Sequence, residues 1–457
     1  MNRAYNFAAG PSMLPLSALT TAAEEMTNFR GSGMSVMEMS HRSKIYLEIF
    51  DETVALLREL MAIPDDYEVL LLQGGATGQF AAVPLNLTVR GSADYVDSGN
   101  FAAGAAKEAA KYTNVNVVAS SKADNYTYIP TIDPAKLNPQ ADYLYITTNN
   151  TIFGTRYTNL PEAQVPLVAD MSSNILSEVY DVTKFGAIIA GAQKNIGPAG
   201  VVVVIVRKDL LGNAQKITPK IMNWQLMAEA NSMVNTPSTY PIYMAGLCLK
   251  WLKEQGGVAA IEKVNIEKAT LLYDYLDGQE FFTNPVEHRY RSTMNVTFTS
   301  PNPDMDKKFC AEAAEAGAFG RIEEGTLTDY ALALIHGVEA NQAQVDERIE
   351  AASENWALSR MPIVDRSILR LAVFEIFNCD DVPVSVSINE AVELAKGFGG
   401  EDDSPRFVNG VLGRIARSME GDGTGAVGVA GADAAAAGPV DALVGASGAA
   451  ACVQVGV

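Results

Sequence analysis

The order of apolar runs along residues 1–318 is the feature that most constrains the fold. Short apolar segments alternate there with segments whose apolar residues recur at helical spacing. The clearest run is VVVVIV at Val201–Val206, which follows a Gly-Pro-Ala-Gly turn. Such alternation favours an α/β domain with a mainly parallel sheet. The expected strands are Glu68–Leu72, Ala93–Val96, Val115–Ala119, Tyr143–Thr147, Pro166–Asp170, Ala187–Ala190 and Val201–Val206.

The pattern changes along the chain, and the changes predict four parts. These are a large domain over 1–240, a small α+β domain over 241–318, a helical segment over 319–419 and a tail over 420–457. The small domain contains a helical stretch at Tyr243–Leu276 and a strand at Met294–Phe298. The third part shows only helical patterns, which predicts an all-α bundle. The fourth is rich in alanine and glycine and has no aromatic residue, lysine or arginine, so we expect it to be disordered.

The helical patterns divide between the two ends of the chain. Leu16–Asn28 and Lys44–Met61 are the helices expected near the start. The helices expected in the bundle are Leu327–Val338, Gln344–Glu354, Pro362–Asn378, Ile388–Phe398 and Arg406–Met419.

Charge and composition exclude several classes of function. The formal net charge is −20, which argues against broad electrostatic binding of nucleic acid or of an anionic membrane. The four cysteines are scattered and the three histidines lie far apart, so we expect no metal site. We expect a reduced, cytoplasmic protein, because the cysteines show no disulfide pattern and no apolar run is long enough for a signal core or a bilayer span.

Polar groups at three positions could carry chemistry. Lys194 lies between two expected buried strands, where a lysine in dry surroundings can act as a nucleophile. Asp170 ends the strand VPLVAD, at the sheet edge where α/β folds bind ligands. Together they suggest that the lysine forms an imine while the carboxylate keeps a pyridinium ring charged. The ordinary alternatives are an exposed loop lysine and a helix-capping aspartate.

The third position is a glycine-rich turn. The sequence GGATG follows the EVLLL strand and opens a helix, which exposes backbone N–H groups and the positive end of the helix dipole. It could hold a phosphate, although it matches neither a P-loop nor a dinucleotide fingerprint. A plain tight turn is the alternative.

A series of segments resembles the phosphoserine aminotransferase family. They follow in that family's order from residue 3 to about 317: AAGPSMLP, MSVMEMSHRS, LLLQGGATGQF, TTNNTIFGTRY, VADMSSNILS, AGAQKNIGPAGV, NTPSTYPIYM and RSTMNVTF. The resemblance implies a fold-type I enzyme that depends on pyridoxal 5'-phosphate (PLP) and works as a homodimer with a shared active site. It also implies transfer of an amino group between glutamate and 3-phosphohydroxypyruvate, or in reverse between phosphoserine and 2-oxoglutarate, in serine biosynthesis.

The same resemblance implies roles for single residues. Lys194 corresponds to the Schiff-base lysine and Asp170 to the partner of the pyridine nitrogen. The other implied roles are phosphate binding by Ala76, Thr77 and Gln193, phosphate contacts from the other subunit by Asn235 and Thr236, a hydrogen bond to the ring hydroxyl from Thr151, and substrate-anion binding by His41 and Arg42. A solvated loop pair is the alternative for His41 and Arg42.

Two positions depart from the family pattern. A tryptophan usually stacks on the cofactor ring, whereas this chain has Phe101, whose ring can also stack. The family's terminal segment, with Gly-His-Arg and a later arginine that help to bind substrate, has no counterpart after Glu315–Ala318. We therefore expect the cofactor to bind and turnover to be impaired.

The segment that follows resembles a different family. LRLAVFEI, VPVSVSINEAVELAKGFGGE and RFVNGVLGRIA are similar to the C-terminal part of NusB-type antitermination factors, from about Thr326 to Arg417. Those proteins are helical and bind RNA, but their arginine-rich helix is absent here. Residues 319–457 carry 9 lysines and arginines against 21 acidic residues, so nucleic acid is not the expected partner. The alternatives to an aminotransferase are an RNA- or partner-binding module and an inactive fusion joined near residue 318.

Overall fold

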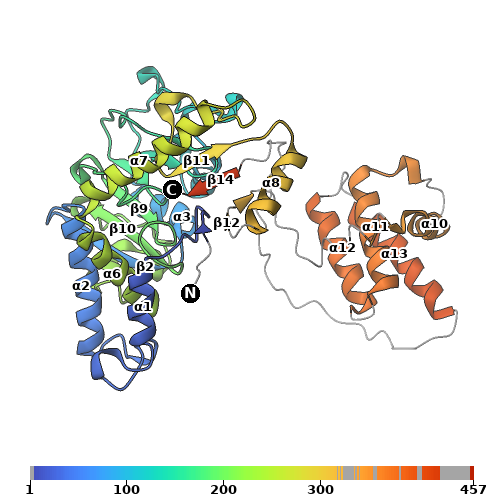
Figure 1. Ribbon diagram of the computed structural model, residues 1–457, viewed down its shortest axis with the longest axis horizontal. Coiled ribbons are helices and arrows are strands. Elements are labelled where there is room, and N and C mark those ends of the chain that lie inside the picture. Colours follow the sequence, from blue (N-terminus) through green and yellow to red (C-terminus); the bar gives the residue numbers. More distant parts are fainter. Residues whose placement is uncertain are drawn as a thin grey trace. The chain divides into compact units, whose positions relative to one another are not determined.

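The computed structural model describes residues 5–315, 318–319, 321–322, 334, 337–338, 340–353, 358–379, 382–398, 404–421 and 453–456. The chain divides into two compact units (Figure 1). Unit 1 comprises Met1–Glu324 together with Ser447–Val457, and unit 2 comprises Gly325–Ala446. The boundary after Glu324 lies a few residues beyond the junction expected near residue 318.

A seven-stranded sheet forms the centre of unit 1. Its strands are β2 (Tyr67–Gln73), β3 (Ser92–Asp97), β4 (Asn114–Ser120), β5 (Leu144–Thr147), β8 (Leu167–Asp170), β9 (Ala187–Gly191) and β10 (Val201–Arg207). The strand order is β2-β10-β9-β8-β5-β3-β4. Only the pairings of β10 with β2 and with β9 are antiparallel in this sheet. The prediction of an α/β fold with a mainly parallel sheet is confirmed.

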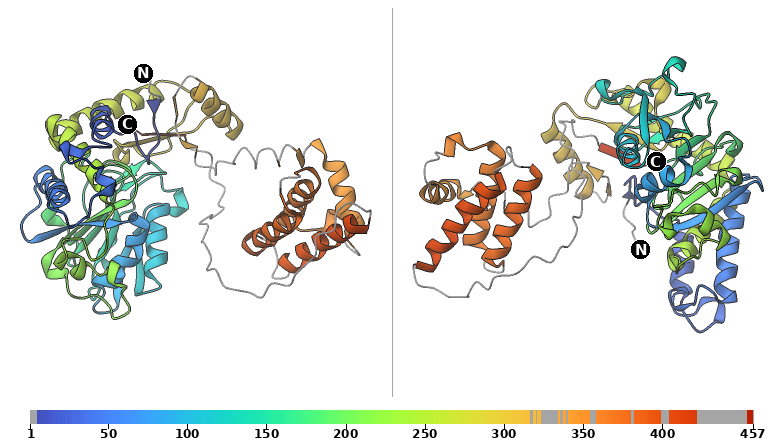
Figure 2. Two further views of the ribbon diagram at one scale, coloured as in Figure 1. Left: turned by 90° about the horizontal axis from the view of Figure 1, so that it is seen from below. Right: turned by 180° about the vertical axis from the view of Figure 1, so that it is seen from behind.

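Helices cover both faces of this sheet (Figure 2). Successive side chains of a strand point to opposite faces. Val203 and Ile205 of β10 therefore pack in one core with α2 (Lys44–Leu60) and α6 (Thr239–Glu254). Val202, Val204 and Val206 pack in a second core with α3 (Ala76–Leu87), α4 (Asn100–Ala109) and α5 (Trp224–Glu229). Burial on both faces explains why the run Val201–Val206 is apolar without interruption.

The helical stretch expected at Tyr243–Leu276 is two helices in the structure. α6 ends at Glu254, and α7 (Val258–Asp277) begins after a turn. Gly256 and Gly257 form this turn with φ values of +96° and +78°. Because residues other than glycine rarely adopt such positive φ values, these two glycines end the helical run.

A smaller sheet lies beside α7 in unit 1. It consists of β11 (Asn295–Phe298), β14 (Val453–Gly456) and β13 (Arg321–Ile322), with β14 in the middle. Val296 and Phe298 of β11 pack on Tyr273 of α7, and α8 (Pro303–Glu315) contributes Phe309. These elements form a small α+β part of unit 1, and the bounds 241–318 stay a prediction.

The chain end corrects one expectation. Residues 420–457 were expected to be disordered, and most of them lie outside the described residues. Val453–Gly456, however, forms β14 and pairs antiparallel with both β11 and β13, as Figure 1 shows in red beside β11. The alternation Val-Gln-Val in VQVG is the period-two pattern of a strand, which the surrounding alanines and glycines obscure.

Shorter elements connect these parts of unit 1. They are β1 (Tyr5–Asn6), α1 (Leu16–Glu24), β6 (Asn149–Asn150), β7 (Thr155–Arg156), β12 (Ala318–Phe319), η1 (Phe29–Gly31), η2 (Val36–Glu38), η3 (Lys122–Asp124), η4 (Pro134–Lys136), η5 (Val182–Lys184), η6 (Lys208–Leu210), η7 (Lys220–Met222) and η8 (His288–Tyr290). β1 pairs in parallel with β12, and β6 pairs antiparallel with β7.

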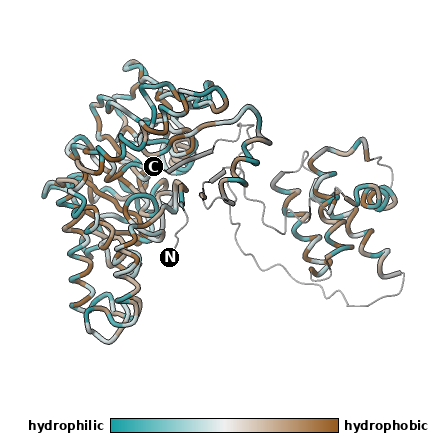
Figure 3. Tube along the Cα trace, viewed as in Figure 1, coloured by the Kyte–Doolittle hydropathy of each residue, from teal (hydrophilic) through white to brown (hydrophobic). Residues whose placement is uncertain are grey.

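The elements described in unit 2 are all helices. Its elements are α10 (Gln342–Ala352), η9 (Leu358–Arg360), α11 (Ile363–Asn378), α12 (Val384–Phe398) and α13 (Ser404–Gly421). Apolar residues recur along these helices (Figure 3) and form one core that includes Ile349, Leu369 and Val411. The helix expected at Leu327–Val338 lies mostly outside the described residues. In the described part of the chain, no helix combines the length and apolar character needed to cross a membrane.

Candidate active site

Lys194 lies in the loop between β9 and β10. Its Nζ donates a hydrogen bond to Oγ1 of Thr151 over 2.7 Å. The loop is held against the start of the chain, because the N–H of Ser12 donates to the carbonyl of Gln193 at 2.9 Å. A Cβ atom on Gly10 would lie only 2.8 Å from Cγ of Lys194, so this glycine leaves room for the lysine side chain. The amine is therefore held in a defined position.

Asp170 is the last residue of β8, the strand next to β9. It is 5% exposed, and its Oδ1 accepts hydrogen bonds from the backbone N–H of Ser172 at 2.9 Å and from the Ser172 hydroxyl at 2.6 Å. Burial raises the pKa of the Asp170 carboxyl, while the bonds from Ser172 and the positive charge of Lys194 offset part of the rise. The Ser172 hydroxyl also accepts from the backbone N–H of Gly191 at 3.0 Å, which joins Asp170 to the strand that leads to Lys194.

Phe101 adds an aromatic face to this site. It lies in the first turn of α4, and its ring centroid is 5.2 Å from Nζ of Lys194. The side chain is 38% exposed, so part of the ring remains open to a ligand. The structure therefore brings Phe101, Thr151, Asp170 and Lys194 together.

The predicted phosphate-binding residues occupy a helix start and two loops. Ala76 and Thr77 are the first two residues of α3, and Gly75 caps the helix. A helix start offers unpaired N–H groups and a positive dipole end to an anion. Gln193 directly precedes Lys194 and is partly buried.

Asn235 and Thr236 lie beside the end of β2 of the same chain. The side-chain amide of Asn235 donates to Oε1 of Gln73 over 2.9 Å, and Nε2 of Gln73 donates to the carbonyl of Thr236. Gln73 is the last residue of β2, three residues before Ala76. A single chain thus places these two residues near the start of α3, and their expected reach into a second subunit stays a prediction.

His41 and Arg42 lie in the loop before α2. The N–H of Arg42 donates to the hydroxyl of Ser40 at 3.3 Å, and the side chain of Arg42 is exposed. Neither residue lines the cavity beside Lys194. Their place relative to Lys194 stays a prediction.

Two residues of this site were not predicted from the sequence. Ser172 holds Asp170, and Gly10 makes room for Lys194. A serine two residues after a strand-end aspartate is a signal that could have found the first. Gly10 is more than 180 residues from Lys194 in the chain, and no local pattern connects the two.

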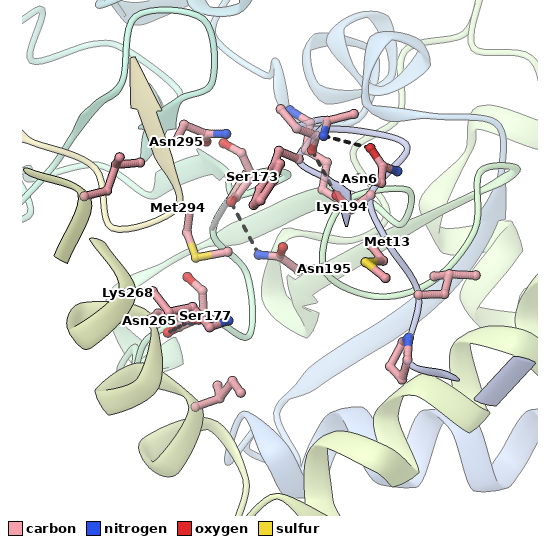
Figure 4. Close-up of a pocket in the computed structure, with 18 of the residues that line it drawn as sticks. Asn6, Met13, Ser173, Ser177, Lys194, Asn195, Asn265, Lys268, Met294 and Asn295 are labelled. Atoms are coloured by element: carbon pink, nitrogen blue, oxygen red, sulfur yellow. Dashed lines mark hydrogen bonds between the residues drawn. The ribbon is translucent and has the colours of Figure 1, made fainter. Parts of the chain in front are cut away.

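A cavity of about 980 Å³ extends from Lys194. Figure 4 shows Lys194 and Asn195 at one part of its wall, with Lys268 and Asn265 of α7 at another. Most of the remaining lining is apolar and includes Trp251, Phe298 and Phe309. Of the predicted site residues only Lys194 borders it, so the cavity adjoins the candidate cofactor site and does not coincide with it.

Residues 4–319 are similar to known aminotransferases. The family model for class-V aminotransferases matches residues 4–319, about two thirds of the chain. A phosphoserine aminotransferase from Bacillus thuringiensis subsp. konkukian is 51% identical over 319 residues, which are 69% of this chain and 89% of the relative. Another, from Herminiimonas arsenicoxydans, is 51% identical over 320 residues, which are 69% of this chain and 88% of the relative. The chain belongs to the phosphoserine aminotransferase family.

The chain also matches a solved aminotransferase structure and a second protein family. The PLP-bound phosphoserine aminotransferase from Trichomonas vaginalis superposes with a TM-score of 0.68 at 37% identity, covering 71% of this chain and 93% of that one. The NusB family model matches residues 291–417, so the two matches overlap over 291–319. The chain therefore joins an aminotransferase to a NusB family domain, as the resemblances predicted.

Proposed function

We propose that this chain binds PLP and transfers an amino group between glutamate and 3-phosphohydroxypyruvate. The observation that carries the proposal is the juxtaposition of the Lys194 amine, the buried Asp170 carboxylate and the open face of Phe101. A lysine for covalent attachment, an anion for the ring nitrogen and an aromatic surface are the groups that PLP requires. The family membership supports the substrate assignment.

Each residue then has a chemical task. When bound, PLP supplies an aldehyde and a ring that accepts electrons. Asp170 would hold the proton on the ring nitrogen, and Phe101 would stack on the ring. Lys194 would hold the cofactor covalently, and its free amine would move a proton at the substrate Cα. The Thr151 hydroxyl, which accepts from Lys194 here, would bond the ring hydroxyl, and Ala76, Thr77 and Gln193 would hold the phosphate.

The attachment is tested with the full-length protein and PLP. Borohydride reduction followed by peptide mass spectrometry should locate the cofactor on Lys194, and Lys194→Ala should lose it. Lys268→Ala removes another lysine that borders the same cavity and should keep the label on Lys194. Labelling of Lys194→Ala to the wild-type extent would overturn the assignment of Lys194. No labelling of the wild type would overturn the proposal and favour an inactive fusion.

We infer a homodimer whose two sites each use residues of both copies. His41 and Arg42 suit a substrate carboxylate or phosphate, because the planar guanidinium binds two oxygens at once. We infer that they bind the substrate anion at the site of the other copy. The family resemblance implies that Asn235 and Thr236 reach the phosphate bound by the other copy, and we assign them this role.

Mixing inactive variants tests this shared site. Lys194→Ala and the double variant Asn235→Ala/Thr236→Ala should each be inactive or weak alone. After refolding together, random pairing puts one intact site in half of the dimers, so about a quarter of wild-type activity should return. Recovery of none, with dimers present by light scattering, would place both residue sets in the same copy's site.

We further infer that turnover with phosphoserine is slow. The family's terminal segment, with Gly-His-Arg and a later arginine that help to bind substrate, has no counterpart after Glu315–Ala318. A doubly charged phosphate and a carboxylate are bound better by arginine forks. Pre-steady-state rates of the glutamate and phosphoserine half-reactions, compared with the Bacillus thuringiensis relative, measure this. Equal rates with phosphoserine would refute the inference.

We infer that the NusB family domain does not bind RNA by itself. Acidic residues outnumber basic ones 21 to 9 over residues 319–457, and phosphate contacts need lysine or arginine. A gel shift with a short leader RNA at low and high salt tests this. A salt-dependent shift would favour the alternative of an RNA-binding module.

A further inference from the structure

The hydroxyl of Ser172 connects the ends of two neighbouring strands. Its Oγ donates to Oδ1 of Asp170 at 2.6 Å and accepts from the backbone N–H of Gly191 at 3.0 Å. Asp170 ends β8, whereas Gly191 ends β9 and precedes Lys194 by three residues. One buried hydroxyl, 7% exposed as a residue, therefore joins the carboxylate to the strand that leads to the lysine.

This arrangement restricts how the Asp170 side chain can turn. Both hydrogen bonds from Ser172, one from its backbone and one from its hydroxyl, reach the same oxygen, Oδ1. Two bonds from different directions on one oxygen hold the carboxyl plane, so Oδ2 keeps a constant direction. Hydrogen bonds to a charged acceptor are the stronger kind.

The neighbouring serine has a different role. The Ser173 hydroxyl donates to the carbonyl of Asn149 at 2.8 Å and accepts from the Asn149 side chain at 2.9 Å. Ser173 is as buried as Ser172, at 6% exposed, and also uses its hydroxyl as donor and acceptor. Because none of its hydrogen bonds reaches Asp170, it is a matched control.

We propose that Ser172 is a positioning residue that aims the Asp170 carboxylate at the ring nitrogen of the cofactor and sets its place relative to Lys194. The inference rests on the proposed function, because it acts through Asp170. Ser172 itself touches neither substrate nor cofactor in this account. Its removal should therefore matter only while Asp170 is present.

The test measures PLP dissociation constants for the full-length protein. Ser172→Ala should weaken binding roughly tenfold, as for loss of a hydrogen bond to a charged group, and Ser172→Thr, which keeps the hydroxyl, should restore most of it. In an Asp170→Asn background, Ser172→Ala should change the constant by less than about twofold. An equal loss in both backgrounds would show a merely structural role and overturn the proposal.

A second measurement needs no cofactor. In the unliganded protein, the shifts in unfolding midpoint caused by Ser172→Ala and Asp170→Asn should be non-additive, whereas those of Ser173→Ala and Asp170→Asn should add. Additive shifts for the first pair would also overturn the proposal. If Asp170→Asn alone left PLP affinity unchanged, the assignment of Asp170 would fail instead, and the two failures remain distinct.

Discussion

The amine of Lys194 and the hydroxyl of Thr151 lie 2.7 Å apart, joined by a hydrogen bond between loops 43 positions apart in the sequence. Thr151 directly follows β6, and Lys194 follows β9. The bond fixes the Lys194 amine with protein groups alone. This part of the site is therefore arranged by the protein itself. Four predictions follow from this and three other contacts.

Thr151→Val removes the hydroxyl and keeps the shape of the side chain. We expect PLP to bind about fivefold more weakly, because a typical hydrogen bond contributes about 1 kcal/mol. Absorbance titration of the full-length protein measures the dissociation constant. Thr151→Ser keeps the hydroxyl and should stay within about twofold of the wild type, and equal weakening by both variants would contradict the prediction.

Gly10→Ala places a methyl group 2.8 Å from Cγ of Lys194. Since a contact under 3.0 Å forces a shift, we expect the lysine to move and the rate of covalent PLP attachment to fall by roughly tenfold or more. Gly104→Ala is the control, because a Cβ there meets no atom within 4 Å and alanine favours the helix. Stopped-flow absorbance follows the attachment. A wild-type rate in Gly10→Ala would show that the loop adapts.

Asp170 should make the stability of the unliganded protein depend on pH. Burial raises the pKa of its carboxyl above the unfolded value, with Ser172 and Lys194 acting against the rise and Tyr145 also facing it. When the pKa of an acid is higher in the folded than in the unfolded state, its protonated form stabilises the folded state. This stabilisation is complete below the unfolded pKa of about 3.9 and is lost as pH rises through the folded pKa.

Asp170→Asn removes this titration. The free energy of unfolding of the wild type minus that of the variant should therefore fall as pH rises from about 4, and then level off. Urea unfolding of the unliganded proteins at a series of pH values measures the difference. A difference that stays constant, or rises with pH, would contradict the stated pKa direction.

Leu369→Ala should destabilise unit 2 alone. Leu369 is fully buried in the helical core, and such a truncation costs about 2–5 kcal/mol. Leu394→Ala on α12 is the control, because Leu394 is 41% exposed and should cost much less. Calorimetry should show two transitions, of which Leu369→Ala lowers one. A shift of both would mean that the units unfold together.

Several features of the site could be predicted from the order of residues. The run at Val201–Val206, the strand ending at Asp170 and the loop lysine at 194 all carry local patterns, and parallel strands bring their carboxyl ends to one edge. Phe101 and Thr151 were added by resemblance, and the structure places both beside Lys194. His41 and Arg42 were added in the same way, and their role stays a prediction.

The sequence by itself determined the positions of the main strands and helices, the strand-end aspartate and the change of character near residue 318. It could do so because apolar periodicity is a local property. Only the tertiary structure decided that Ser172 meets Gly191, that Gly10 makes room for Lys194 and that VQVG becomes the middle strand of the small sheet. Asp170 of β8 pairs with Ile189 of β9. Ser172 and Gly191 each come two positions later in the chain, so this register brings Ser172 to Gly191. Such contacts depend on register and packing between distant segments, which no local pattern records.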